Sequence, residues 1–217
     1  MIEDKFLASI SKGTYDNTFP PGINISKIKY YNGDFLKKYY IFLPGNRVVF
    51  AFRGSESRMD WWNNIMSVHT TDFGQVNVGQ GFLTQLSAES NPYFEFNSET
   101  EIVLTGHSLG GALAQLEAKR LIDYGYANNI KRLVTFGSPK VGAKSFQEHL
   151  DKYLLDKTTH YIFGDDLTPS LPPKFYRTSE SNVIELGSKR SWLNPNKYIH
   201  LFKDHSMDSY MEALNAI

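Results

Sequence analysis

Residues 101–125 constrain the fold of this chain more than any other segment. The stretch EIVLT at residues 101–105 has the composition of a buried strand, and GALAQLEAKRLIDYG, which begins at Gly111, has the apolar spacing of an amphipathic helix. Between them lies Gly-His-Ser-Leu-Gly, where a strand must turn sharply into a helix and only small neighbours of Ser108 leave room for that turn. The segment predicts strand, turn and helix in direct succession, with the Ser108 hydroxyl raised above the end of a sheet.

A glycine-rich turn in which Ser108 only caps the helix beginning at Leu109 is the alternative interpretation. It requires no strand before the turn, whereas the first interpretation requires strand, turn and helix together. All three are present in the pattern, which favours the first. In that arrangement the start of the helix adds backbone N–H donors and the positive end of its dipole near Ser108, where developing negative charge would be stabilised.

Strand and helix patterns alternate through the rest of the chain. Residues 37–52, KKYYIFLPGNRVVFAF, predict two strands joined by a tight turn at Gly45 and Asn46. The later predicted elements are a strand at 132–136, a helix at 145–154, a strand at 160–163, a hairpin formed by KFYRTS and NVIELG, and a closing helix MDSYMEALNAI. This alternation predicts an α/β fold with a mainly parallel central sheet covered by helices on both faces. No linker or repeat divides the sequence, so we expect one domain over residues 1–217.

The composition argues against several classes of function and of partner. Lys plus Arg equals Asp plus Glu at 23 each, so no field of one sign favours nucleic acid as a partner. The longest apolar runs, such as residues 48–52, are far shorter than the roughly 20 residues of a transmembrane helix. Cysteine is absent, which excludes disulfides, thiolate nucleophiles and cysteine-ligated metals. The first residues, MIEDKFLASISKG, lack the basic start and apolar run of a secretory signal, which favours a cytoplasmic location without excluding secretion.

Several blocks of the sequence together resemble the class 3 lipase family, which includes fungal triacylglycerol lipases. The blocks are VVFAFRGSESRMDWWNN, GQGFL, TGHSLGGALAQLEA, TFGSPKVG, FGDDLTPSLPP and DHSMDSY. The resemblance implies an α/β-hydrolase fold in which Ser108 is the nucleophile, Asp166 the acid and His205 the base. The region before the predicted hairpin is short, so the N-terminal helix of typical members is expected to be reduced or absent.

The choice of base and acid depends on chain order and on this resemblance. A serine nucleophile needs a base within hydrogen-bond reach and an acid that orients the base. Chain order leaves two histidines, His200 in the apolar run YIHLF and His205 at a loop-to-helix junction, where catalytic groups commonly lie. We favour His205. For the acid, Asp165 and Asp166 both follow the strand end, and alignment of DLTPSLPP with the family pattern selects Asp166.

Two donors are expected to stabilise the negative charge that ester cleavage places on the carbonyl oxygen. They are the backbone N–H of Leu109, directly after Ser108, and Ser55, which the resemblance identifies as an oxyanion-hole residue. Without the resemblance, FRGS is only a strand followed by a turn. A candidate lid follows Ser55, and core packing is an equal interpretation of its apolar side chains. These side chains are Trp61, Trp62, Ile65 and Met66.

The predicted function is hydrolysis of acyl esters, acylglycerols or related lipids, by a serine hydrolase that needs no metal or cofactor. The expected partners are the lipid or other acyl ester substrate and, transiently, a lipid interface. A phospholipase or an acyltransferase would use the same three residues, and the pattern around Ser108 does not separate these activities. A catalytically silent binding module is a further alternative, and it predicts the loss of at least one of the three residues.

Overall fold

A seven-stranded sheet lies at the centre of the computed structural model, which describes residues 2–23, 28–32, 37–55, 70–86, 96–172, 182–188 and 203–217. In spatial order its strands are β1 (Ile28–Asn32), β2 (Lys37–Leu43), β3 (Arg47–Phe52), β6 (Glu101–His107), β7 (Ile130–Phe136), β8 (Thr158–Phe163) and β9 (Asn182–Leu186). The five strands from β3 to β9 pair in parallel, and β2 joins them antiparallel at one edge. The mainly parallel sheet predicted from the sequence is confirmed.

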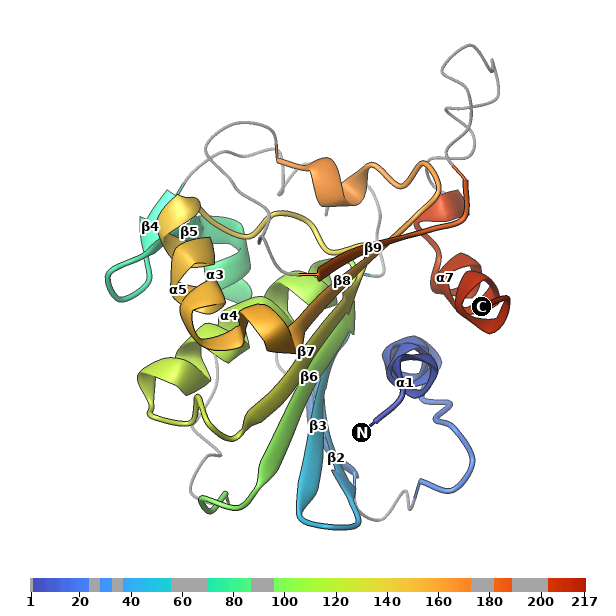
Figure 1. The fold of residues 1–217 in the computed structure, drawn as a ribbon, viewed down its shortest axis with the longest axis horizontal. Helices are drawn as coiled ribbons and strands as arrows, with labels where there is room; N and C mark the ends of the chain where they lie inside the picture. The colour runs from blue at the N-terminus through green and yellow to red at the C-terminus, as the bar shows by residue number, and fades with distance from the viewer. Residues whose placement is uncertain are drawn as a thin grey trace.

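Helices cover both faces of this sheet, as Figure 1 shows. One face carries α3 (Gln80–Leu86), α4 (Leu109–Asp123) and α5 (Lys144–Leu154), and the other carries α1 (Asp4–Asp16) and α7 (Met207–Asn215). Side chains of β3 alternate between the two faces, as strand geometry requires. Phe50 packs in the hydrophobic cluster of the α4 face, and Val49 packs in that of the α1 face. The chain therefore buries two apolar layers, one on each side of the sheet.

Three short elements complete the described structure. A separate two-stranded sheet pairs β4 (Thr70–Asp72) with β5 (Asn77–Gly79). Two 3-10 turns, η3 (Leu155–Lys157) and η4 (Thr168–Ser170), lie before and after β8. The second of these turns follows the loop that carries Asp166, so it forms part of the region beyond the carboxyl ends of the parallel strands.

The hairpin and the helices predicted from local patterns are present at the expected places. β2 and β3 pair antiparallel through a turn in which Gly45 has φ 79° and Asn46 has φ 55°. The predicted helices correspond to α4, α5 and α7, with boundaries that differ by at most a few residues. The periodic spacing of apolar residues and the identity of the turn residues were sufficient to predict these elements, because both signals come from neighbouring residues in the sequence.

The N-terminal region was expected to have a reduced helix or none. A helix is present there, α1, so its absence is excluded. α1 buries Leu7 and Ile10 against the sheet face that also carries α7. Polar contacts fix it at both ends: Asp4 pairs with Arg132 of β7, and Lys12 pairs with Asp208 of α7. The helix covers the sheet face behind β6 and brings the Tyr15 hydroxyl to 2.8 Å from Nδ1 of His107, the residue before Ser108.

Of the predicted hairpin of KFYRTS and NVIELG, the structure describes only the second segment, which is a strand as expected. NVIEL forms β9, which pairs in parallel with β8, with Thr159 opposite Asn182 and Phe163 opposite Leu186. KFYRTS lies outside the described residues. The chain between β8 and β9 exceeds the dozen or so residues that a parallel connection needs. The pairing with β8 covers an edge that would otherwise leave its backbone groups unpaired, and this long-range gain is not visible in the local pattern.

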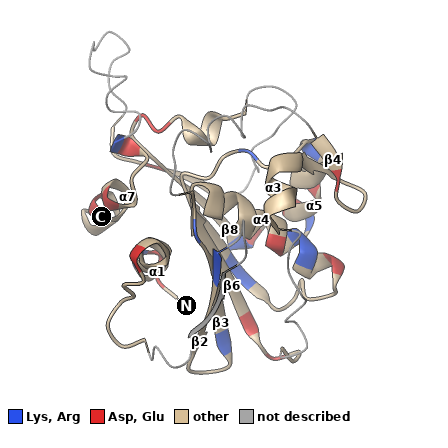
Figure 2. Ribbon diagram, turned by 180° about the vertical axis from the view of Figure 1, so that it is seen from behind, with Lys and Arg blue, Asp and Glu red and all other residues tan. Residues whose placement is uncertain are grey.

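Charged residues of both signs are interspersed over the ribbon in Figure 2, in keeping with the formal net charge of zero. In this view Lys and Arg positions do not gather on one element, and Asp and Glu positions lie between them. Within the described residues, every helix is too short or too polar to cross a bilayer.

Candidate functional site

Ser108 occupies the tight turn between β6 and α4. Its backbone has φ 58° and ψ −128°, a combination that residues other than glycine rarely adopt. The Ser108 amide donates to the Phe136 carbonyl at 2.9 Å, and the amide of Gly111 donates to the Ser108 carbonyl at 2.9 Å. These bonds hold the turn between a strand and a helix, as predicted. The Ser108 side chain makes no capping hydrogen bond to α4, which rules out the helix-capping interpretation.

Two glycines make this turn sterically feasible. A Cβ on Gly106 would collide with the carbonyl oxygen of Gly110, and a Cβ on Gly110 would collide with the carbonyl oxygen of Phe52. The end of β6, the start of α4 and the end of β3 therefore pass each other at backbone contact distance. Glycine at both positions lets the strand turn into a helix within two residues.

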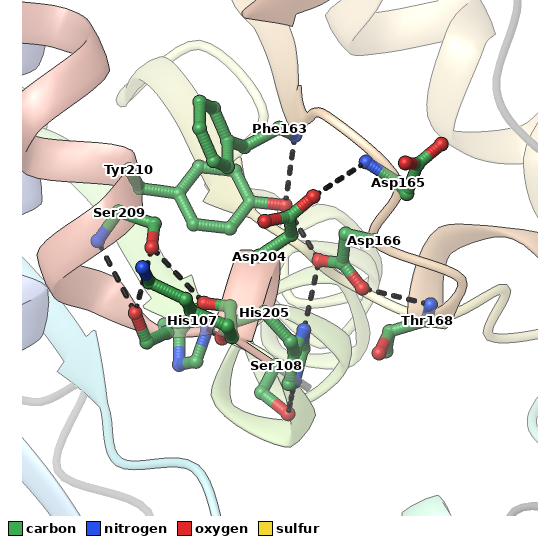
Figure 3. A network of polar contacts seen from close by, with 12 residues as sticks. His107, Ser108, Phe163, Asp165, Asp166, Thr168, Asp204, His205, Ser209 and Tyr210 are labelled. Carbon is green, nitrogen blue, oxygen red and sulfur yellow. Dashed lines mark hydrogen bonds and ion pairs between the residues drawn. The ribbon is translucent and has the colours of Figure 1, made fainter. Parts of the chain in front are cut away.

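Ser108, His205 and Asp166 meet at the carboxyl end of the sheet (Figure 3). The Ser108 Oγ lies 2.7 Å from Nε2 of His205, and Nδ1 of His205 lies 2.8 Å from Oδ2 of Asp166. Because a carboxylate only accepts, Nδ1–H of His205 donates to Asp166, which leaves Nε2 to accept from the Ser108 hydroxyl. Residues 97 and 39 positions apart in the sequence thus form one continuous hydrogen-bonded chain.

The Asp166 carboxylate is buried and accepts two further hydrogen bonds. The Tyr210 hydroxyl donates to Oδ2 at 2.6 Å, and the Thr168 amide donates to Oδ1 at 2.9 Å. Burial alone would raise the pKa of Asp166, but its interactions with His205, Tyr210 and the Thr168 amide outweigh burial and lower it below 3.8. Burial and the adjacent carboxylate raise the pKa of Tyr210, so the phenol stays protonated and remains a donor. The carboxylate is therefore ionised and fixed in orientation.

Gly137, directly after β7, lies underneath this cluster. Its φ is 57°, and a Cβ at this position would lie 2.6 Å from Oδ2 of Asp166, 2.9 Å from the Tyr210 hydroxyl and 3.1 Å from Nδ1 of His205. The hydrogen bond between Asp166 and His205 therefore passes directly over a backbone without a side chain. Any larger residue would displace at least one of the three groups.

The loop that carries His205 is held from both sides. On one side, the buried carboxylate of Asp204, the residue before His205, accepts from the Asp165 amide through Oδ2 at 2.9 Å. On the other side, Ser206 caps α7 by accepting from the Ser209 amide at 3.2 Å. These contacts tie the loop after β8 to the start of α7, so Asp166 and His205 are positioned by the same small group of bonds.

The two predicted oxyanion residues lie on either side of the Ser108 turn. Leu109 is the first residue of α4, and the first amides of a helix have no intrahelical acceptor. Ser55 follows β3, and its neighbour Gly54 runs so close to the turn that a Cβ there would lie 2.8 Å from the His107 carbonyl oxygen. Their roles stay predictions. Outside the described residues lie the alternative base His200 and the candidate lid, namely Trp61, Trp62, Ile65 and Met66.

Sequence patterns assign no role to Tyr210 or Gly137. Tyr210 occupies a buried position of α7, where an aromatic residue is expected for packing alone. For Gly137, the Thr-Phe-Gly-Ser segment indicates a turn with positive φ at the glycine. That pattern does not show which side chains pack against the glycine. Both roles depend on contacts between distant segments.

Comparison with solved structures supports the fold. A crystal structure of a lipase from Rhizopus microsporus var. chinensis superposes with a TM-score of 0.68 at 20% sequence identity, over 82% of this chain and 72% of that one. At this identity the likeness concerns the fold alone. It confirms the α/β-hydrolase fold that the sequence resemblance implied.

Two curated relatives match shorter parts of the sequence. A protein of Gibberella zeae named "Secreted mono- and diacylglycerol lipase 3" is 31% identical over 96 residues, which cover 44% of this chain and 28% of the relative. A protein of Oryza sativa subsp. indica named "Phospholipase A1-II 1" is 29% identical over 123 residues, which cover 54% of this chain and 30% of the relative. The chain thus spans less than a third of the length of these two relatives.

The cytoplasmic location favoured from the sequence is overturned by these relatives. The Gibberella zeae protein and relatives from Malassezia globosa and Penicillium cyclopium are all named as secreted lipases, which points to secretion instead. The prediction rested on the composition of the first residues.

A family model matches more than half of the chain. The model described as "Lipase (class 3)" matches residues 49–176, which include the Ser108 turn and Asp166. The matched region starts within β3 and ends just beyond η4, so it contains most of the parallel sheet and more than half of the chain. The chain belongs to the class 3 lipase family.

Proposed function

We propose that this protein is a serine ester hydrolase that cleaves acyl esters, in particular acylglycerols or related lipids. The observation that carries the proposal is the continuous chain from Ser108 Oγ through His205 to Asp166, with separations of 2.7 and 2.8 Å. This is the arrangement in which a hydroxyl can lose its proton as it attacks a carbonyl carbon. The family membership and the names of the relatives support the same class of reaction.

The proposed reaction has two halves. In the first, Ser108 Oγ attacks the ester carbonyl carbon while Nε2 of His205 takes the hydroxyl proton, and that proton passes to the leaving alcohol as the bond between carbon and alkoxy oxygen breaks. In the second, Nε2 of His205 takes a proton from water, the hydroxide attacks the acyl-enzyme, and Ser108 regains its proton as the carboxylic acid leaves. Each half begins and ends with neutral His205.

Asp166 supports both halves by holding His205 and by stabilising its transient positive charge. Its lowered pKa keeps the carboxylate ionised, and Tyr210 and the Thr168 amide fix the orientation of the two oxygens. The negative charge on the substrate oxygen requires donors as well, each worth on the order of a hundredfold in rate. We assign this task to the backbone N–H of Leu109 and to Ser55.

The proposed substrate class and setting follow from the relatives. The mono- and diacylglycerol lipases among them favour acylglycerols, and their names favour secretion. A lipid substrate would present itself at an interface, so transient contact with a lipid surface is part of the proposal. The candidate lid after Ser55 would provide such contact through its apolar residues.

Cleavage of phospholipids is a second candidate, favoured by the relative named phospholipase A1. The same three side chains can cleave the acyl ester of an acylglycerol or of a phospholipid. They can also transfer the acyl group if an alcohol replaces water in the second half of the reaction. A catalytically silent module is disfavoured, because all three side chains are present and hydrogen-bonded in sequence.

The test is hydrolysis of nitrophenyl esters of graded chain length, alongside emulsified triacylglycerol, diacylglycerol and phospholipid, by the wild type and by Ser108→Ala. We expect the wild type to release acid from at least one of these substrates and the variant to retain less than about a thousandth of the rate. Equal turnover by Ser108→Ala would disprove the proposal. The preferred emulsion separates the acylglycerol assignment from the phospholipid one, and added alcohol reveals acyl transfer.

A further inference from the structure

A second hydrogen-bonded chain approaches His205 from the opposite side, through α1. The Tyr15 hydroxyl, at the end of α1, lies 2.8 Å from Nδ1 of His107, and Nε2 of His107 lies 2.7 Å from the carbonyl oxygen of His205. His107 is only 6% exposed, and its ring is tilted against the ring of His205 with the centroids 4.7 Å apart. Figure 3 shows His107 beside the pair formed by Ser108 and His205.

The directions of these bonds follow from the groups involved. The His205 carbonyl oxygen only accepts, so Nε2 of His107 carries a hydrogen and donates it. Burial, and then the positive charge that His205 can carry, lower the pKa of His107 to about 3, so the ring stays neutral and its Nδ1 has a free lone pair. Nδ1 therefore accepts from the Tyr15 hydroxyl. Every polar atom of the His107 ring is used, and neither nitrogen contacts Ser108.

The chain continues beyond Tyr15 to the segment after β3. The Tyr15 hydroxyl oxygen packs against the backbone of Gly54, so closely that a Cβ on Gly54 would collide with that oxygen. The Arg53 guanidinium lies over the Tyr15 ring, 5.7 Å from its centroid. Gly54 precedes Ser55, so one close backbone contact and two hydrogen bonds connect the candidate oxyanion side of the site with the main chain of His205.

We propose that Tyr15 and His107 are positioning residues, which hold the main chain of His205 at a fixed separation from the Gly54 and Ser55 segment. Asp166 and Ser108 contact the ring of His205, and the bond from Nε2 of His107 restrains its carbonyl group. Such a chain matters because misplacement of a reacting group by about 1 Å can reduce turnover by about a hundredfold. The inference rests on the proposed function, since it assigns His205 the role of base.

The experiment compares three substitutions by kcat and KM for a soluble nitrophenyl ester, with kcat expressed per active serine titrated by a fluorophosphonate. Tyr15→Phe keeps the ring and removes only the hydroxyl, and we expect kcat to fall about fivefold at unchanged KM. His107→Leu removes both bonds, with an expected fall of about tenfold to a hundredfold. His107→Gln should recover most of that loss, because its amide N–H reaches the place of Nε2 and can donate to the His205 carbonyl.

A double variant tests whether the two residues act as one unit. If they form a single chain, Tyr15→Phe combined with His107→Leu should lose no more kcat than His107→Leu alone. Losses that multiply would overturn the positioning chain. So would an unchanged kcat in Tyr15→Phe or His107→Leu, or a loss in His107→Gln equal to that in His107→Leu.

Ser11→Ala is the matched control. Ser11 lies on the same helix and forms a buried hydrogen bond with Thr105 at 3.0 Å. Loss of the Ser11 hydroxyl therefore weakens the contact of α1 with the sheet but leaves the hydrogen bonds of Tyr15 and His107 in place. We expect a lower unfolding midpoint but an unchanged kcat per titrated serine. A fall of kcat as large as that in the Tyr15 and His107 variants would show that those variants act through general stability and not through positioning. An active Ser108→Ala would defeat the proposed function itself. An inactive Ser108→Ala with fully active Tyr15 and His107 variants would defeat only the positioning role.

Discussion

Gly137→Ala perturbs the site without changing any group assigned to the reaction. The added Cβ would lie 2.6 Å from Oδ2 of Asp166 and 3.1 Å from Nδ1 of His205, well inside the roughly 3.5 Å at which such atoms pack. Asp166 or the backbone must then shift by roughly 0.5–1 Å, which predicts a fall of kcat of about tenfold to a hundredfold at little change in KM. The positive φ at this position adds a stability loss of roughly 1–2 kcal/mol.

Gly125→Ala separates these two effects. Gly125 has φ 88°, but no atom lies within 4 Å of the place that a Cβ would take. Both variants should show a lower free energy of unfolding in urea, whereas only Gly137→Ala should lose kcat per titrated serine on a soluble nitrophenyl ester. The reasoning is refuted if Gly137→Ala keeps the wild-type kcat, or if Gly125→Ala loses as much.

Two further substitutions test the buried polar groups. Tyr210→Phe removes a bond that lowers the pKa of Asp166, so it should cost about 1–3 kcal/mol of stability where Asp166 is ionised. This loss should shrink as the pH falls below 3.8 and through the lowered pKa of Asp166 in the folded protein, because a protonated Asp166 no longer gains from the Tyr210 hydrogen bond in the wild type. The measurement is urea unfolding of both proteins across this pH range, and a stability difference that stays constant would contradict the assignment. Lys38→Met breaks the fully buried pair with Glu117, separated by 3.1 Å, and should cost about 3–5 kcal/mol in the same assay. The double variant with Glu117→Gln should recover part of that cost, and no recovery would show that the pair is not the cause.

The features that the sequence predicted correctly depend on local signals. The Ser108 turn follows from a strand, small residues and a helix in succession, and the β2 and β3 hairpin follows from two apolar runs around Gly45 and Asn46. The order of Ser108, Asp166 and His205 along the chain, together with the family resemblance, selected three side chains that the structure brings into hydrogen-bond contact. Their hydrogen bonds in the structure have the geometry that this choice required.

The features that the sequence did not predict depend on contacts between distant segments. β9 pairs in parallel with β8, which satisfies backbone groups of a strand far away along the chain, and no local pattern shows this pairing. α1 was underestimated because the region was judged by its length, although Leu7 and Ile10 have the spacing of a helix face. The contact of Tyr15 with His107 joins residues 92 positions apart, and no short pattern contains both.

The most direct test of the central claim is to map the covalent acyl-enzyme. The wild type is mixed with an activated nitrophenyl ester, quenched in acid during turnover, digested and analysed by mass spectrometry, with Asp166→Asn as a variant whose base is held in the wrong orientation. The account predicts one acyl group per chain, on the peptide that contains Ser108 and on its hydroxyl, formed far more slowly in Asp166→Asn. Turnover with the acyl group on another residue, or an equal rate of acylation in the variant, would contradict it.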